Sequence, residues 1–361
     1  MGGMKFFNGA LIFVFAAVFA GCSSAPKFGE GVYPVGAVLP LSDESAVAAR
    51  DALDGMLLAA KKVNSAGGIA GLELKIVARD CGAGKSFGEA FDALRRDGVK
   101  VVSVGFDEQV VSWHTRLMKC DDVFINYMCQ YPPATLDSQN STRIFLNGAQ
   151  DGDLLSTVVE RPDSRDVNIV AMSVDSLFGK ACGDYLAFCL KLEHTKFYSD
   201  VFSSGTRDFS IFSEQMKRLF PQYIFYVGRG SELKPFVESV CRDGYAGVIA
   251  SCAVFGFEPF DVPDGVKFYR TATAFELGKV ATPVSREFVA AFKAEFGREP
   301  TWVAAYGYDS VLALSKAVVA AKFNPAKMRA QFAGAKIDGA VGTITFDSSA
   351  DSLSELEVVG K

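Results

Sequence analysis

Charged side chains stand directly after two short apolar segments of this chain. Asp107, Glu108 and Gln109 follow one such segment, and Arg229 follows another. Loops at the carboxyl ends of parallel strands converge on the ligand cleft of open α/β sheets. An arginine holds a carboxylate through two parallel hydrogen bonds, whereas acidic side chains favour a cation. We therefore expect Asp107, Glu108 or Gln109 to share a ligand cleft with Arg229, unless the two acids merely cap the next helix.

Patterns that would indicate catalysis or a metal site are missing from the sequence. Residues 81–86 end like a phosphate-binding loop, but Arg79 stands where that loop requires glycine, so a helix-capping loop is expected. His114 and His194 have no helical His partner and no Cys-x-x-Cys companion, which argues against zinc. No nucleophile elbow is present. We expect no enzymatic activity, no metal and no cofactor.

The first residues form an export signal. Lys5 precedes an almost wholly apolar run over residues 6–20, which is too short to span a membrane. Small residues then stand before Cys22, an arrangement that resembles a bacterial lipobox. We expect a signal peptide over residues 1–21, lipidation of Cys22 and a tether over residues 22–31. The alternative is an ordinary signal peptide with a chance cysteine. The lipoprotein interpretation places the chain in the cell envelope, anchored at the periplasmic or outer surface.

Composition narrows the class of protein further. The chain has 361 residues, 49% of them hydrophobic, which suffices for two lobes. Its net charge of -5 argues against a nucleic-acid partner, which would require a basic face. Eight cysteines occur, so lipidation of Cys22 would leave an odd number. Some disulfides are plausible in an oxidising compartment, but at least one thiol would stay unpaired.

Strand-length and helix-length segments alternate along the chain, which predicts parallel sheets covered by helices. The first series has predicted strands at residues 35–39, 72–78, 100–104 and 123–127, and predicted helices at 45–64, 87–96 and 109–119. The second has strands at residues 167–173, 196–202, 223–227 and 246–250, and helices at 179–192, 209–220 and 232–242. Predicted helices at residues 285–296, 304–321 and 325–332 and strands at 343–346 and 356–359 complete the chain. Two such series favour two similar lobes with a ligand cleft between them.

Several segments carry a family resemblance. Residues 35–41 read Val-Gly-Ala-Val-Leu-Pro-Leu, residues 64–71 read Asn-Ser-Ala-Gly-Gly-Ile-Ala-Gly, and a strand then ends at Asp80. The segments at residues 97–99 and 305–310 fit the same pattern. The sequence resembles the type I periplasmic binding proteins, especially the branched-chain amino-acid (Leu/Ile/Val) receptors. The resemblance covers essentially the whole mature chain and is sharpest in its first third.

The resemblance implies an α/β fold of two doubly wound, Rossmann-like lobes with parallel sheets, joined by a hinge of three crossovers. The crossovers are expected near residues 143–150, 267–274 and 351–355. The N-terminal lobe would comprise residues 32–147 plus 275–353, and the C-terminal lobe residues 148–274 plus 354–361. Closure of the lobes would bury a ligand by hinge motion.

The resemblance also implies a set of ligand-binding positions. They lie in loops that follow predicted strands, or beside such loops: Ser42, Asp43, Phe106, Asp107, Glu108, Gln109, Tyr127, Cys129, Gln130, Phe178, Arg229 and Cys252. Amino-acid receptors of the family offer Ser or Thr to the ligand carboxylate, where Asp107 and Glu108 would repel it. Either the ligand differs, or the charges are reversed, with Arg229 facing an anion and an acid facing a cation.

Two functions remain at this point. One is a solute-binding lipoprotein of an ABC importer, which captures a small polar ligand such as an amino acid and delivers it to the transporter's membrane subunits. The other is an interaction or regulatory envelope lipoprotein of the same fold that binds no small ligand. Because fold does not settle function, both are retained.

Overall fold

The computed structural model describes residues 28–43, 45–160, 166–242, 244–252, 259–280 and 282–360. The expected signal peptide and Cys22 lie outside these residues, and only the last residues of the expected tether lie within them. Within the described part of the chain, no helix has both the length and the apolar character needed to cross a membrane.

The first lobe is built on a five-stranded parallel sheet with the order β2-β1-β3-β4-β5. Its strands are β1 (Val32–Leu39), β2 (Glu73–Asp80), β3 (Val101–Val104), β4 (Phe124–Tyr127) and β5 (Ser141–Arg143). Every residue of β3 and β4 is buried, as expected for strands covered on both faces. The helices of this lobe are α1 (Ala46–Ser65), α2 (Phe87–Arg96), α3 (Asp107–Met118), α8 (Pro283–Phe296) and α9 (Trp302–Ala320).

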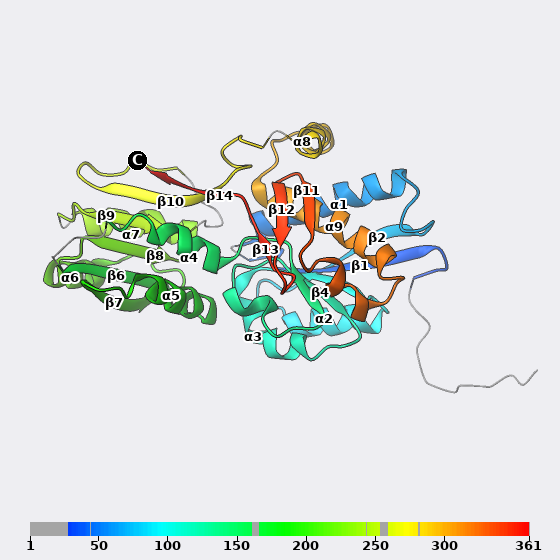
Figure 1. The fold of residues 1–361 in the computed structure, drawn as a ribbon, viewed down its shortest axis with the longest axis horizontal. Helices are drawn as coiled ribbons and strands as arrows, with labels where there is room; N and C mark the ends of the chain where they lie inside the picture. Colours follow the sequence, from blue (N-terminus) through cyan, green and yellow to red (C-terminus); the bar gives the residue numbers. More distant parts are fainter. Residues whose placement is uncertain are drawn as a thin grey trace, which may run out of the picture.

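The second lobe has a six-stranded sheet with the order β14-β10-β9-β8-β6-β7, in which only the β10–β14 pair is antiparallel. Its strands are β6 (Val167–Val174), β7 (Thr195–Phe202), β8 (Tyr223–Val227), β9 (Val248–Ser251), β10 (Lys267–Thr273) and β14 (Leu356–Gly360). Its helices are α4 (Gly148–Ser156), α5 (Leu177–Leu190), α6 (Ser210–Leu219) and α7 (Gly230–Arg242). Figure 1 shows the two lobes side by side, with the late helices α8 and α9 on the first lobe and β14 returning to the second.

The chain passes between the lobes three times, as expected. It leaves the first lobe after β5, returns after β10, and crosses again before β14. The α/β class with two doubly wound lobes is therefore confirmed. The lobe boundaries given above stay a prediction at the level of single residues.

A buried ion pair joins the first and third crossovers. Nε of Arg143 lies 2.8 Å from Oδ1 of Asp351, and Nη2 donates to Oδ2 over 3.1 Å. Arg143 is fully buried, and its guanidinium also donates to the carbonyl oxygens of Cys129 and Pro132. Burial raises the pKa of Asp351, and Arg143 opposes that rise. The pair fixes two passing segments of the hinge to each other.

Helices α1 and α9 cross closely in the first lobe. A methyl group on Gly55 would overlap the carbonyl oxygen of Ala304, and one on Gly307 would overlap that of Ala52. The two glycines therefore let the helix backbones approach more closely than any other residue would allow.

Local signals explain several helix boundaries. Ser86 caps α2 by accepting from the amide of Glu89, so the expected helix-capping loop at residues 81–86 is confirmed. Thr282 caps α8, which ends at Gly297 in the left-handed conformation.

Some expectations about the elements were wrong. The helix expected at residues 325–332 is two short 3-10 turns, Pro325–Lys327 and Arg329–Gln331. The segment expected only as the second crossover contains the full strand β10, and the crossing begins after it. Helix α4 was not predicted. A small antiparallel sheet contains β11 (Lys336–Gly339), β12 (Gly342–Phe346) and β13 (Ser352–Leu353), and of these strands only β12 was predicted. These elements are short, and tertiary contacts stabilise them more than local propensity does.

Candidate functional site

A small pocket lies between the two lobes. Its lining comes from loops that follow strands, as expected, and from the starts of the next helices: Ser45, Phe106, Glu108 and Gln130 in the first lobe, and Val174, Phe178, Gly228 and Arg229 in the second. The free space is only ≈ 30 Å³, which is room for about two water molecules. The pocket is therefore nearly closed in this state.

An ion pair across the lobes fills this pocket. Oε2 of Glu108 lies 3.0 Å from Nη2 of Arg229, and the two side chains are only 38% and 24% exposed. Glu108 stands in the first turn of α3, whereas Arg229 stands in the loop before α7. Both residues line the same pocket, and a ligand-binding role for either stays a prediction. The anion that Arg229 meets is the protein's own carboxylate.

Two further carboxylates surround this pair. Burial raises the pKa of Glu108, and the negative charges of Glu232 and Asp43 raise it further. Burial lowers the pKa of Arg229, although Glu232 and Asp43 favour its charged form. Three acidic residues thus act on one guanidinium.

Glu232 was not among the expected site residues. It is fully buried in the first turn of α7, where Oε2 accepts from the amide of Arg229 at 3.3 Å and from the hydroxyl of Tyr226 at 3.5 Å. Its other oxygen accepts from the amide of Gly205. An acidic residue early in a helix that follows a strand-end loop is a capping signal, and this signal could have identified it.

Aromatic rings supply the apolar part of the pocket. Phe106 and Phe178 are both buried and come from opposite lobes. The Phe106 ring packs against Phe145, with 5.9 Å between ring centroids. The expected placement of both rings in the cleft agrees with the pocket lining.

Gln130 lines the pocket and also forms a hydrogen bond that joins the two lobes. It is buried, and Nε2 donates to Oδ2 of Asp151 over 2.8 Å. Asp151 belongs to α4 and also accepts from the hydroxyl of Thr271 in β10. Asp151 therefore connects the loop after β4 with two elements of the second lobe.

Three other expected residues, Ser42, Asp43 and Gln109, do not line the pocket. Asp43 accepts from the amide of Ser45, and the exposed Ser42 forms a hydrogen bond with Asp80. Gln109 is half-buried in the first turn of α3. Asp107 begins that helix, and its side chain lies outside the described part of the structure.

Three expected residues belong to the hydrophobic cores. Tyr127 and Cys129 are fully buried in the core beneath α2 and α3, and Cys252 is buried in the core of the second lobe. Burial raises the pKa of Tyr127 and that of Cys252. Their assignment to the pocket is not supported, because each side chain points into a core. Cys81, Cys120, Cys189, Cys241 and Cys252 are free thiols, so no disulfide forms at these positions.

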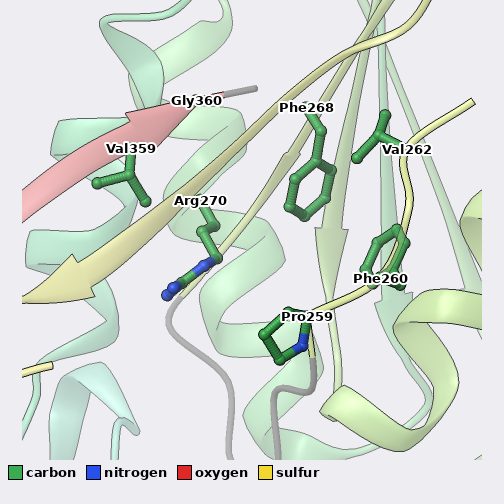
Figure 2. A pocket seen from close by; sticks show the side chains of 7 residues that line it. All are labelled: Pro259, Phe260, Val262, Phe268, Arg270, Val359 and Gly360. Atoms are coloured by element: carbon green, nitrogen blue, oxygen red, sulfur yellow. The ribbon is translucent and has the colours of Figure 1, made fainter. Parts of the chain in front are cut away.

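A second hollow of ≈ 270 Å³ lies within the second lobe alone. Figure 2 shows Phe260, Val262 and Phe268 around it, with Arg270 and Val359 on neighbouring strands. Arg270 donates to Glu276 over 2.7 Å. Because the described residues that line this hollow all belong to one lobe, closure of the hinge would not enclose a ligand there.

Comparison with known proteins agrees with this fold. A family model described as periplasmic binding protein matches residues 32–354. No curated protein sequence matches the chain.

Solved structures share the fold. The leucine binding protein LivK of Thermotoga maritima superposes with a TM-score of 0.75 at 19% identity, over 91% of this chain and 95% of that one. LivJ of Streptococcus pneumoniae, in complex with isoleucine, gives 0.72 at 17% identity, over 91% and 100%. A solute binding protein of Rhodopseudomonas palustris, in complex with 3,4-dihydroxy benzoic acid, gives 0.73 at 19% identity, over 91% and 93%.

Proposed function

The chain belongs to the periplasmic binding protein family, and from this premise we propose that it is a Leu/Ile/Val-binding-like solute-binding lipoprotein of an ABC importer. It captures a small polar ligand, an amino acid or a related compound, between its lobes and presents it to the membrane subunits of the transporter. Lipid on Cys22 holds it at the membrane surface. The family implies a location outside the cytoplasm.

The observation that carries this proposal is the pocket between the lobes. Charged and aromatic side chains from both lobes converge there, and a three-segment hinge allows the lobes to separate. A ligand must displace the contact between Glu108 and Arg229, since the closed pocket has almost no free volume.

The same closed pocket favours a second candidate function. If the ion pair between Glu108 and Arg229 is permanent, the protein is an interaction or regulatory lipoprotein that binds no small ligand. The pair would then serve only to hold the two lobes together.

A thermal-shift screen of the mature chain against amino acids, small acids, small amines and sugars separates the two candidates. A ligand that binds only the folded state stabilises it by about 2.7 kcal/mol at a hundredfold excess over Kd. Solute capture predicts a shift with at least one class of solute and its loss when the pocket residues are substituted. A flat response across all classes would favour the regulatory function.

A further inference from the structure

Acidic side chains surround the charged pair in the interlobe pocket. Glu108 and Arg229 are the two charged residues among the described residues that line the pocket. Asp43 and Glu232 do not line it, but their negative charges act on both members of the pair. Arg207 acts on Tyr226, and its guanidinium donates to the carbonyl of Ser231. The surroundings of the pair therefore favour a positive charge in the pocket.

Arg229 has alternative partners in the closed state. Besides the contact with Glu108, both Asp43 and Glu232 act on its charge. Glu232 cannot move toward a ligand, because the amides of Gly205 and Arg229 hold its buried carboxylate. If Arg229 leaves Glu108, Asp43 and Glu232 still favour its charged form, and the space that its guanidinium fills becomes free.

Glu108 pairs with one cation, Arg229, in the part of the chain that the structure describes. Its pKa is raised by burial and by the neighbouring acids, so its charged form depends on a cation close by. Phe106 and Phe178 line the same pocket, and aromatic faces attract ammonium groups when water is excluded. An anionic ligand would have to displace Glu108 and then sit beside Asp43 and Glu232.

We infer that the interlobe pocket takes a small organic cation, whose ammonium group replaces the Arg229 guanidinium at Glu108 between Phe106 and Phe178. When no ligand is bound, the guanidinium of Arg229 occupies the position at Glu108 that the ammonium group of the ligand would take. This inference rests on the proposed solute-capture function and names its ligand class.

Titration calorimetry on the mature chain tests the inference with probes matched in shape and opposite in charge: benzylamine against benzoate, and butylamine against butyrate. The amine of each pair is expected to bind at least tenfold more tightly than the acid. Glu108→Gln should weaken amine binding by about tenfold or more. Glu238→Gln is the matched control, because Glu238 is an exposed residue of α7 paired with Lys234.

The variant Arg229→Gln tests whether Arg229 competes with the ligand or binds it. If Arg229 competes with the ligand, this variant binds the amines as tightly as the wild type or more tightly. A loss of amine binding in Arg229→Gln, or tighter binding of the acids, would overturn the inference.

The measurements distinguish a failure of the cation assignment from a failure of the proposed solute-capture function. Binding of a neutral or acidic solute, with the amines inert, would leave solute capture standing and overturn the cation assignment. No binding by any solute class would overturn both.

Discussion

The carboxylate of Glu108 lies 3.0 Å from the guanidinium of Arg229, and this contact joins the start of α3 in one lobe to the loop before α7 in the other. The pair spans the surface across which the lobes must part. Its partial exposure limits its strength to about 1 kcal/mol, which is enough to bias a hinge but not to lock it.

Glu108→Gln is expected to favour the open form of the ligand-free protein. Loss of about 1 kcal/mol would raise the ratio of open to closed molecules by about fivefold. Small-angle scattering should then report a larger radius of gyration. Asp184→Asn, which removes an exposed pair within the second lobe, serves as the control. Unchanged scattering in Glu108→Gln would mean that other contacts hold the lobes closed.

Arg143→Met is expected to destabilise the protein by about 3–5 kcal/mol, because it leaves Asp351 charged and buried without its partner. The midpoint of urea unfolding measures this loss. Lys180→Met, which removes one member of an exposed pair, should change stability by less than about 1 kcal/mol. A small effect of Arg143→Met would show that the hinge repacks around the loss.

Asp309 is expected to make stability fall as pH rises. Both of its oxygens accept backbone amides, from Ala340 at 2.7 Å and Val341 at 3.0 Å, and burial raises its pKa to about 7. In the unfolded chain an aspartate has a pKa of about 3.9. Between these values the folded state keeps the proton that the unfolded state has lost, so unfolding becomes easier as pH rises through this window.

The contribution of Asp309 amounts to at most about 4 kcal/mol, fully present below about pH 4 and lost near pH 7. Denaturant titrations at several pH values measure it. Asp309→Asn should flatten the slope relative to the wild type. Asp338→Asn, at an exposed position in the sheet of β11, β12 and β13, is the control substitution. Equal slopes in the wild type and Asp309→Asn would refute the assignment.

Gly307→Ala is expected to lower stability by about 2 kcal/mol or more, since its methyl group would overlap the backbone of α1 at Ala52. Helix propensity alone predicts the opposite, a gain of about 1 kcal/mol. The thermal unfolding temperature of Gly307→Ala distinguishes the loss of stability from the gain. Val319→Ala, on the exposed face of α9, is the control for propensity. A more stable Gly307→Ala protein would show that the helices can separate at no cost.

Cys22→Ser is expected to release the protein from membranes into the soluble fraction. Small residues before Cys22 and the apolar run before them predict lipidation, and more than one acyl chain is needed for stable anchoring. Cell fractionation followed by mass spectrometry of the N-terminus measures the outcome. A wild-type protein that is already soluble and cleaved elsewhere would exclude the anchor.

The sequence by itself determined the fold class and predicted which strand-end residues line the pocket between the lobes. Alternating strands and helices, ended by glycines and capping residues, specify the parallel sheets locally, and the ends of parallel strands must meet at one edge. Hence Glu108, Phe106, Phe178 and Arg229 could be assigned to the cleft from the sequence.

The tertiary structure alone decided what these residues do there. Strand ends fix the edge of the sheet, but the pleat and the register decide whether a side chain points into a core or a cleft, and so Tyr127 and Cys252 proved to be core residues. The contacts of Glu108 with Arg229 and of Arg143 with Asp351 join residues far apart in the chain. No local pattern encodes such pairs, because their partners are chosen only when the lobes and the crossovers of the hinge come together.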